Sequence, residues 1–547
     1  MPSSSKHVKR PGCLRFLAVA AACGLASVLP ARAESETIDG VVWTYTLDGT
    51  SATVTGAEPA AGALSIPPRL GGCPVTSIGK GAFFECSPLT SLTLPEGVKS
   101  ISPGAFAGCD GLTAVVLPES LQDIGEEAFA GCRRLAEAVI PGNVTNIAPW
   151  AFAACEALPA VVVPDRVRSV GMGAFVRCTG AETVVLGDAL APEAIGREAF
   201  TGCLKAVEVR VGEGNPSCKS VDGVLFTKDG RTLLWCPPGR TGTYALPEGV
   251  AAIGENAFKG CTGLTAVTLP DSLERIGTGA FSGCRGLDTV DFGHGVREIG
   301  DAAFRGCTAL ASVAFPDSVT HVGTQAFQFC PGLLSVALGN GLVEIGDAFR
   351  QCGSLESVAF GTRLETIGEN AFGSCALKTV DLPDNVRNVG QGAFSSCRQL
   401  ESVTFGKGVT NIGASAFMYC RNLSIVSIPG NVACIGKGAF SCTGVRAVAV
   451  DDGVREIGAG AFSACKQLSG VALGDGLRRI GHGAFSGCVG LTEMTLPESL
   501  ESLDRTFACS GVRILRVPAS WEGTPMLASA DLPKSCRVLY YGPASAE

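Results

Sequence analysis

Cysteine is the side chain with the greatest chemical potential in this sequence, which has 25 cysteines but only 4 histidines among 547 residues. Clustered thiols bind zinc or form disulfides, and a thiol beside a base can act as a nucleophile. Eighteen of the cysteines close a recurring Ala-Phe phrase, such as "GAFAGC" at 104–109, and so return once in each copy of a repeat. Because this spacing gives no C-x-x-C pair and no histidine cluster, we expect no metal site and no cofactor.

The recurring cysteines are also poorly placed for disulfide bonds. If the repeats stack, equivalent cysteines lie about 5 Å apart with parallel Cβ vectors, whereas a disulfide needs Cβ atoms about 3.5–4.5 Å apart. The sequence therefore predicts a buried column of eighteen free thiols that act as small apolar side chains. Five further cysteines lie outside the phrase, and the sequence leaves their state open: Cys73, Cys218, Cys236, Cys434 and Cys536.

Residues suited to catalysis are scarce. His294, His321 and His482 occupy variable positions of the repeat, which predicts solvated surface histidines. Serines and acids also sit at variable positions, without the local asymmetry of a nucleophile, a base and an orienting acid. We therefore predict no catalytic residues and no enzyme activity. An enzyme of unknown type in the insertion or the termini is the least supported class, because about 35 and 44 residues are too few for a catalytic domain.

An acidic residue recurs after the proline at the corner of the repeat, as at Glu96, Asp271 and Asp384. Calcium takes about six to eight oxygen ligands, and one carboxylate per repeat cannot supply them. We predict that these acids cap turns.

Composition limits the classes of partner. The chain is 46% hydrophobic and 17% charged, with a formal net charge of −8 and a pI near 5.3. Binding to phosphate backbones needs clustered Lys and Arg, whereas acidic residues outnumber basic ones here. We expect no nucleic-acid partner and no small-molecule substrate.

The phenylalanine of the phrase marks eighteen copies of one repeat, at positions 83, 106, 129, 152, 175, 200, 258, 281, 304, 327, 349, 372, 394, 417, 440, 462, 485 and 507. This period predicts a solenoid whose coils contact only their neighbours. In "LTSLTLP", Leu89, Leu92 and Leu94 point to one side, as in a short strand with one buried face. After the corner, residues 98–109 suit a short helical or 3₁₀ return segment. The predicted fold is a repeat solenoid with short parallel β-strands on one face.

The phrase "L-x-x-V-x-L-P-[DE]-S-[LV]-x-x-I-G-x-x-A-F-x-G-C" resembles that of BspA-like leucine-rich repeat proteins, over nearly all of the chain after residue 33. Departures are small: the eleventh coil loses one residue before Ala348, the fifteenth loses one between Phe440 and Cys442, and the eighteenth has Thr506 in place of Ala. The resemblance implies a curved right-handed solenoid at the bacterial surface. It further implies adhesion to host matrix proteins, to cells or to other bacteria.

Two segments break the period. Before the first coil, "IDGVVWTYTLDGTSATVTG" predicts a β-hairpin cap with a two-residue turn at 48–49, which would pair Tyr45 with Ala52 and Trp43 with Val54. A cap shields the apolar cross-section of the first coil from water.

The second break is the long interval between Phe200 and Phe258, which holds "SVDGVLFTKDGRTLLWCPPG". Its Asp-Gly pair predicts a hairpin with strands at 224–228 and 231–235 that projects from the solenoid between the sixth and seventh coils. This register places Cys236 opposite Gly223, so we predict no disulfide to Cys218.

The N-terminus predicts export. Lys6, Lys9, Arg10 and Arg15 precede an apolar run at 16–29, and "ARA" at 31–33 suits cleavage after Ala33. A lipoprotein modified at Cys23 is the minor alternative. We expect no transmembrane segment after removal of the signal peptide, because no second run of about 18 apolar residues follows.

The sequence thus divides into six predicted parts. These are a signal peptide (1–33), an N-terminal β-hairpin cap (34–77), a first block of repeats (78–203), a coil with a hairpin insertion (204–247), a second block of repeats (248–517) and a C-terminal cap or tail (518–547).

The leading function is binding or adhesion to a protein ligand, on a host matrix or cell surface, by a secreted or surface-displayed protein. The outward strand positions are mostly Ser, Thr, Ala and Val, a bland surface that also suits a structural spacer without a ligand. A single specific site would lie at the hairpin insertion, on Lys228, Asp229, Arg231 and Trp235. The alternative is that Leu233 and Trp235 only pack the hairpin onto the neighbouring coils.

Overall fold

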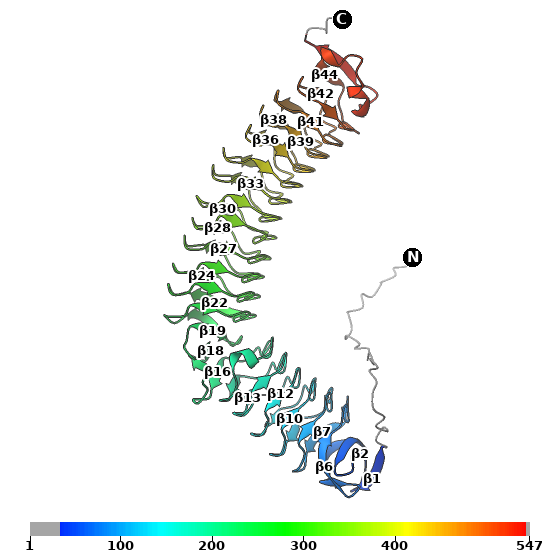
Figure 1. Cartoon of the computed structure of the whole chain (residues 1–547), viewed down its shortest axis with the longest axis vertical. Helices are drawn as coiled ribbons and strands as arrows, with labels where there is room; N and C mark the ends of the chain where they lie inside the picture. The colour runs from blue at the N-terminus through cyan, green and yellow to red at the C-terminus, as the bar shows by residue number, and fades with distance from the viewer. Residues whose placement is uncertain (1–32, 543–547) are drawn as a thin grey trace, which may run out of the picture.

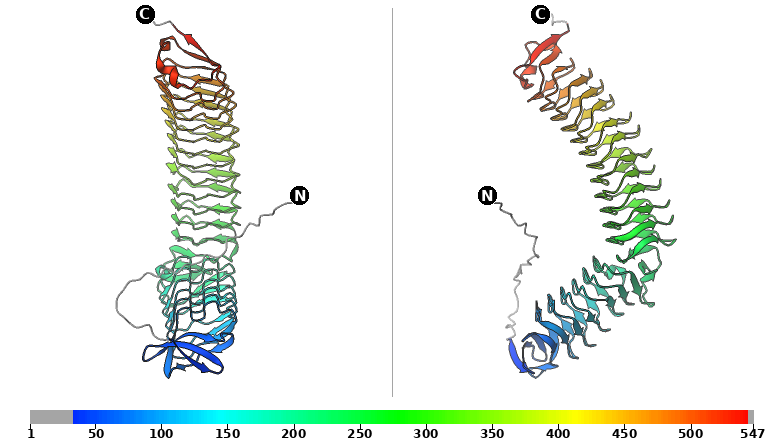
Figure 2. Two further views of the ribbon diagram at one scale, coloured as in Figure 1. Left: turned by 90° about the vertical axis from the view of Figure 1, so that its right-hand side faces the viewer. Right: turned by 180° about the vertical axis from the view of Figure 1, so that it is seen from behind.

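The computed structural model describes residues 33–542, which form an elongated β-solenoid with a bend between the sixth and seventh coils (Figure 1). Residues 1–32, with most of the predicted signal peptide and Cys23, lie outside the described residues. Two further views show that the coils stack one above another on both sides of the bend (Figure 2). The predicted repeat solenoid is confirmed.

One strand of each coil belongs to a row of parallel sheets, here called the strand face. On the N-terminal side of the bend it comprises β4 (Gly62–Ser65), β7 (Leu89–Thr93), β9 (Ala114–Val116), β11 (Glu137–Ala138), β13 (Ala160–Val163), β15 (Thr183–Leu186) and β16 (Glu208–Val211). Beyond it are β20 (Thr241–Ala245), β22 (Gly263–Thr268), β24 (Thr289–Asp291), β26 (Ser312–Ala314), β28 (Ser335–Ala337), β30 (Ser357–Ala359), β32 (Thr379–Asp381), β34 (Ser402–Thr404), β36 (Ile425–Ile428), β38 (Ala447–Val450), β40 (Gly470–Leu473), β42 (Glu493–Thr495), β44 (Ile514–Pro518) and β45 (Arg537–Tyr541).

A second row of sheets is made mainly of two-residue strands from the other half of each coil. It begins with β6 (Cys73–Ile78), to which β5 (Arg69–Leu70) pairs, and continues with β8 (Ser100–Ile101), β10 (Asp123–Ile124), β12 (Asn146–Ile147) and β14 (Ser169–Val170). After the bend it comprises β21 (Ala252–Ile253), β23 (Arg275–Ile276), β25 (Glu298–Ile299), β27 (His321–Val322), β29 (Glu344–Ile345), β31 (Thr366–Ile367), β33 (Asn388–Val389), β35 (Asn411–Ile412), β37 (Cys434–Ile435), β39 (Glu456–Ile457), β41 (Arg479–Ile480) and β43 (Ser502–Leu503).

The return segments differ from the sequence-based expectation. Within 98–109, residues 100–101 form a strand and 103–108 form successive turns, where a helical or 3₁₀ segment was predicted. Helical segments among residues 33–542 are limited to three 3₁₀ turns, η1 (Pro192–Ala194), η2 (Ala519–Trp521) and η3 (Pro525–Ser529).

Backbone hydrogen bonds between coils explain this difference. The Phe106 N–H donates to the Ala128 carbonyl of the next coil at 2.8 Å, and the N–H groups two residues before and after it do the same. We call this series the return ladder: three donors per coil, at the phenylalanine and two residues to either side. Because alternate N–H groups are used between coils, they are not available for a helix within one coil.

The phenylalanines stack along the solenoid axis. Successive rings within each block are 4.6–6.2 Å apart at their centroids and within 13° of parallel. Offset stacks of this kind contribute about 0.5–1.5 kcal/mol per pair beyond the area they bury. The column therefore favours one register for every coil.

The cysteine column has a role that its spacing alone does not predict. The Cys284 thiol donates to the carbonyl of Phe258 in the preceding coil, with 2.9 Å between sulfur and oxygen. Fourteen cysteines make the equivalent bond: 109, 132, 155, 178, 203, 284, 307, 330, 352, 375, 397, 420, 465 and 488. Burial raises the pKa of Cys203 and of Cys397 to about 12, so these thiols remain protonated at neutral pH.

Two of the eighteen recurring cysteines do not belong to the column, so the prediction of eighteen is wrong. Cys442 lies two residues after Phe440 at φ 60°, and Thr443 takes the buried position, where its hydroxyl donates to the Phe440 carbonyl at 2.8 Å. Cys509 is displaced in the same way and is exposed. The residue missing from the fifteenth coil is thus lost after the cysteine position and not before it, and sixteen cysteines form the column.

The recurrent acids cap turns, as predicted, but the turn belongs to the following coil. Each carboxylate accepts a backbone N–H from the residue that follows it by one repeat. The bonds are His294 to Asp271 at 2.8 Å, Lys407 to Asp384 at 2.8 Å and Glu119 to Glu96 at 3.2 Å. The three predicted surface histidines are also exposed.

The N-terminal cap is a hairpin whose turn is longer than predicted. β1 (Glu34–Ile38), β2 (Val41–Leu47) and β3 (Ala52–Glu58) form an antiparallel sheet, and β3 joins β6 in parallel. Tyr45 pairs with Val54 and Trp43 with Ala57, because the loop has four residues and the register shifts after Thr44. The Asp48 carboxylate closes this loop by accepting the Ser51 N–H at 2.7 Å.

The hairpin insertion lies within the solenoid and does not project from it. β17 (Cys218–Val221), β18 (Val224–Thr227) and β19 (Thr232–Trp235) are antiparallel, and β19 joins β21 in parallel. Val224, Leu225 and Phe226 are buried. The core divides into two clusters of buried side chains, which meet at this insertion. The insertion lies at the bend of the solenoid (Figure 1).

We expect Cys284→Ala to destabilise the protein more than Cys442→Ala. The first change removes a buried sulfur and its hydrogen bond, at a cost of about 1–3 kcal/mol, whereas the second affects a half-buried thiol outside the column and costs about 0.5 kcal/mol or less. Urea denaturation followed by circular dichroism measures both. Equal midpoints for the two variants would contradict a structural role of the column.

The acid caps predict a loss of stability at low pH. The backbone N–H of His294, followed by its side chain, lowers the pKa of Asp271 in the folded state. A folded-state pKa below the unfolded value of about 4 stabilises the fold above that pH, and this contribution disappears as the pH falls.

Asp271→Asn should therefore lower the urea midpoint at pH 7 and have a smaller effect at pH 3. Asp288→Asn is the matched control, because Asp288 is exposed and its carboxylate makes no hydrogen bond within residues 33–542. A difference between Asp271→Asn and the unmodified protein that stays constant from pH 7 to pH 3 would exclude the carboxylate as the cause.

Candidate functional site

The turn of the insertion holds three of the four residues predicted as a site. Lys228, Asp229 and Arg231 lie between β18 and β19, at the surface. Asp229 orders the turn, because its carboxylate accepts the Thr227 hydroxyl at 2.6 Å and the Arg231 N–H at 2.9 Å. The Thr227 hydrogen bond, followed by that of Arg231, lowers the pKa of Asp229. The two cations are thus presented on a fixed loop.

Trp235 lies at the opposite end of β19 and does not join these charges. Its indole rests on the Phe200 ring at 5.5 Å between centroids, with a tilt of 43°. Leu233 is buried, so Leu233 and Trp235 do pack the insertion onto the neighbouring coils. The structure therefore separates the four residues into a charged turn and a half-buried aromatic position.

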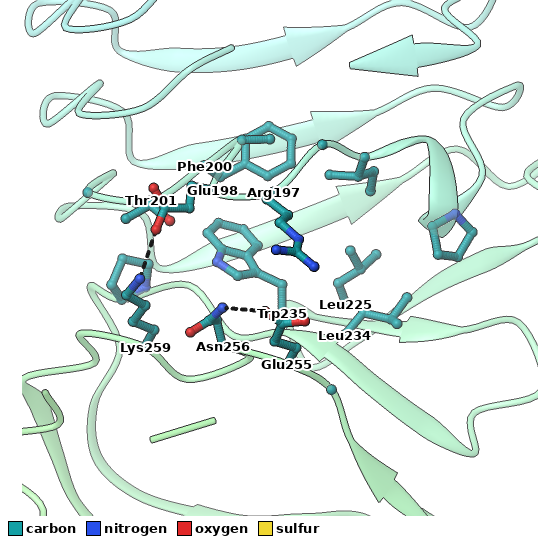
Figure 3. A pocket seen from close by; sticks show the side chains of 17 residues that line it. Arg197, Glu198, Phe200, Thr201, Leu225, Leu234, Trp235, Glu255, Asn256 and Lys259 are labelled. Carbon is teal, nitrogen blue, oxygen red and sulfur yellow. Dashed lines mark hydrogen bonds and ion pairs between the residues drawn. The ribbon is translucent and has the colours of Figure 1, made fainter. Parts of the chain in front are cut away.

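Beside Trp235 is a cavity of about 250 Å³, here called the bend cavity (Figure 3). It opens between the return segments of the sixth and seventh coils, where the insertion separates them. Its lining comprises Pro192, Ile195, Gly196, Arg197, Glu198, Ala199, Phe200, Thr201, Gly202, Leu225, Leu234, Trp235, Pro238, Gly254, Glu255, Asn256 and Lys259. Apolar and aromatic side chains thus line a hollow with a few polar groups, as in most ligand sites.

The charged side chains of the bend cavity lie on both of its coils. Lys259 forms an ion pair with Glu198 across the cavity at 2.9 Å, and the Asn256 amide donates to Glu255 at 3.4 Å. Arg197 extends toward the Trp235 indole in Figure 3 and forms no ion pair within residues 33–542. Within the described residues, the cavity thus presents both a guanidinium without an ion-pair partner and an indole ring.

The mixture of apolar and charged side chains suits binding. The lining residues include no histidine, cysteine or serine. Among residues 33–542, no three His, Cys, Asp or Glu side chains are grouped so as to hold a metal ion.

Reasoning from the sequence found Trp235 but missed Arg197, Glu255, Asn256 and Lys259. These residues occupy variable positions of ordinary repeats, on either side of the long interval between the sixth and seventh phenylalanines. The unusual length of this interval was the available signal, because two coils separated by an insertion cannot form the regular hydrogen bonds and ring stacking with each other.

The strand face also carries a row of exposed valines, which are among the outward positions identified from the sequence. Val116, Val139 and Val162 occupy the same outward position in three successive coils, with 58%, 82% and 49% of their surface exposed. A shared outward position that returns once per repeat is visible in the sequence once the strands are aligned.

Parallel strands on one face, tight returns and a short, regular repeat define the fold as a leucine-rich-repeat solenoid. Comparison with family models gives a match described as a BspA type leucine-rich repeat region (6 copies), at residues 76–213, 241–348, 344–469 and 435–525. The match covers more than half of the chain, and the protein belongs to this family. The gap between the first two ranges contains β17, β18 and β19.

Solved structures give similar results, whereas no curated protein matches the chain. A leucine-rich cell surface protein from Faecalibacterium prausnitzii is 26% identical, with 62% of this chain and 98% of that chain covered and a TM-score of 0.47. A leucine-rich repeat protein from Bacteroides ovatus is 23% identical, with 93% and 100% covered and a TM-score of 0.42. The pneumococcal vaccine antigen PcpA is 20% identical, with 68% and 98% covered and a TM-score of 0.47.

Proposed function

We propose that this protein is a non-catalytic binding or adhesion protein, secreted or displayed on the bacterial surface, that contacts a protein of a host matrix or of a neighbouring cell. Its membership of a repeat family and the predicted signal peptide with cleavage after Ala33 support export and binding. Among residues 33–542, no helix has the length and apolar character needed to cross a membrane.

The observation that carries the proposal is the position of the insertion. A periodic surface offers similar contacts at many coils, whereas the insertion places a rigid charged turn at one end of β19 and an aromatic cavity at the other. Recognition commonly uses such irregular segments held on a rigid scaffold. The bend is therefore our proposed site, with Lys228, Asp229 and Arg231 as contacts on the turn and Trp235 in the cavity.

A structural spacer is the second candidate, and the aromatic column favours it. An uninterrupted stack from Phe258 to Phe507 makes the second block a stiff rod that could hold another part of the cell surface at a distance. A spacer needs no ligand, so saturable binding to a partner is expected of an adhesion protein but not of a spacer.

We expect the double substitution Lys228→Glu and Arg231→Glu to lower retention of the mature protein on immobilised extracellular matrix by roughly tenfold, through slower association. Asp229 is left in place because it orders the turn. The matched control is Arg363→Glu with Lys407→Glu, which reverses two exposed charges in the second block. Circular dichroism first establishes that both variants fold. Equal retention of the two double variants would reject the turn, and absence of saturable retention of the unmodified protein would favour the spacer.

A further inference from the structure

The return ladder is interrupted at the bend cavity. In the fifth coil, Gly173, Phe175 and Arg177 donate their N–H groups to carbonyls of the sixth coil at 2.8–3.0 Å. The equivalent donors of the sixth coil belong to Glu198, Phe200 and Gly202, and within residues 33–542 these three N–H groups have no hydrogen-bond acceptor. All three residues line the bend cavity.

The opposite wall of the cavity carries the matching acceptors. In the regular pattern, the carbonyls of Glu255, Ala257 and Lys259 would receive the three donors of the preceding coil. Ala257 receives the Cys236 N–H of the insertion at 2.7 Å, whereas the carbonyls of Glu255 and Lys259 receive no backbone N–H within residues 33–542. The cavity therefore lies between one edge of free donors and another edge with two free acceptors.

The insertion cannot complete this ladder by itself. After Cys236 the chain continues with Pro237 and Pro238, neither of which has an N–H to donate. Trp235 covers the Phe200 ring at 5.5 Å, so the apolar end of the first block is shielded while its backbone edge stays open. A row of free N–H groups can pair with the carbonyls of another chain.

We infer that the bend cavity receives a short peptide segment of a partner protein, whose backbone accepts the N–H groups of Glu198, Phe200 and Gly202 and donates to the carbonyls of Glu255 and Lys259. This inference rests on the proposed function and specifies how the partner is recognised. In the regular ladder the acceptors are alternate carbonyls of the next return segment, so the bound segment follows the course of a return segment beside these donors.

The lining defines the side chains that such a segment carries. Ile195, Leu225, Leu234 and Trp235 favour one apolar side chain pointing into the cavity. The free guanidinium of Arg197 favours an acidic residue beside it. The segment therefore carries an apolar residue next to an acidic one.

Hydrogen–deuterium exchange followed by mass spectrometry tests the free edge. In the unliganded protein, we expect segment 196–203 to exchange at least about tenfold faster than segment 171–178, which has the same place in the preceding coil but a complete ladder. Equal protection of the two segments would overturn the inference.

Peptide binding is tested with heptapeptides selected from a random phage-displayed library on the mature protein. We expect the synthetic peptides to slow exchange of segment 196–203 at least tenfold, because their carbonyls accept its free N–H groups. N-methylation of the peptide amides removes the N–H groups that would pair with the carbonyls of Glu255 and Lys259, and should lower the affinity at least tenfold. Leu234→Trp, which fills the cavity, should abolish this binding. Leu334→Trp, at an exposed leucine of the second block, should not.

Three results would overturn the inference: no selected peptide, selected peptides that leave exchange of 196–203 unchanged, and equal binding to Leu234→Trp. These results are distinct from failure of the proposed function. Loss of peptide binding with preserved adhesion rejects the cavity alone, whereas peptide binding without adhesion to matrix rejects the proposed partner class.

Discussion

Stacking of coils in a fixed register is the constraint on which the rest of this structure depends. A single coil cannot bury its own apolar side chains, and it leaves alternate N–H groups of its return segment without partners. The next coil satisfies both needs at once, because the return ladder, the phenylalanine stack and the thiol bonds all join the same pairs of coils. Length changes are accepted only where they preserve these positions. The eleventh coil is one residue shorter, yet the Phe349 ring still stacks at 5.2 Å and 5.6 Å on its neighbours.

The insertion at the bend relaxes this constraint in one place and restores it within a few residues. β19 takes the position of a return strand by pairing with β21, and Cys236 re-enters the ladder through the Ala257 carbonyl. Trp235 takes the place of a phenylalanine next to the first block. The last ring of that block, Phe200, therefore packs against an indole and is shielded from water. The two prolines then stop the ladder. The result is two cores joined by a segment that covers the apolar surface of the sixth coil. Within the described residues, this segment provides no acceptors for the backbone N–H groups of that coil.

The periodic part of this architecture is readable from the sequence because each structural role recurs at a fixed residue type. Phe106 or Phe281 can be placed in the column from spacing alone, and the acid at Asp271 can be assigned to a turn. The return segments were predicted as helical because short apolar spacing does not reveal that their N–H groups bond to the next coil. Cys442 was placed in the column because its residue type matched, whereas its position relative to Phe440 did not. The bend cavity depends on backbone groups left over when a ladder ends, and residue types carry little information about those.

An open backbone edge inside a folded array needs protection, because exposed edges invite pairing with other chains and aggregation. The donors of the sixth coil are free, but Pro192 of η1 and the pair Trp235 and Pro238 line the cavity and limit its extent to about 250 Å³. A whole sheet or another solenoid cannot enter a space of this size, whereas a short peptide segment can. The same geometry that prevents uncontrolled pairing therefore confers selectivity, since it admits short segments and rejects larger edges. This distinguishes the cavity from the strand face, where every coil presents a similar surface and binding would be distributed along the array.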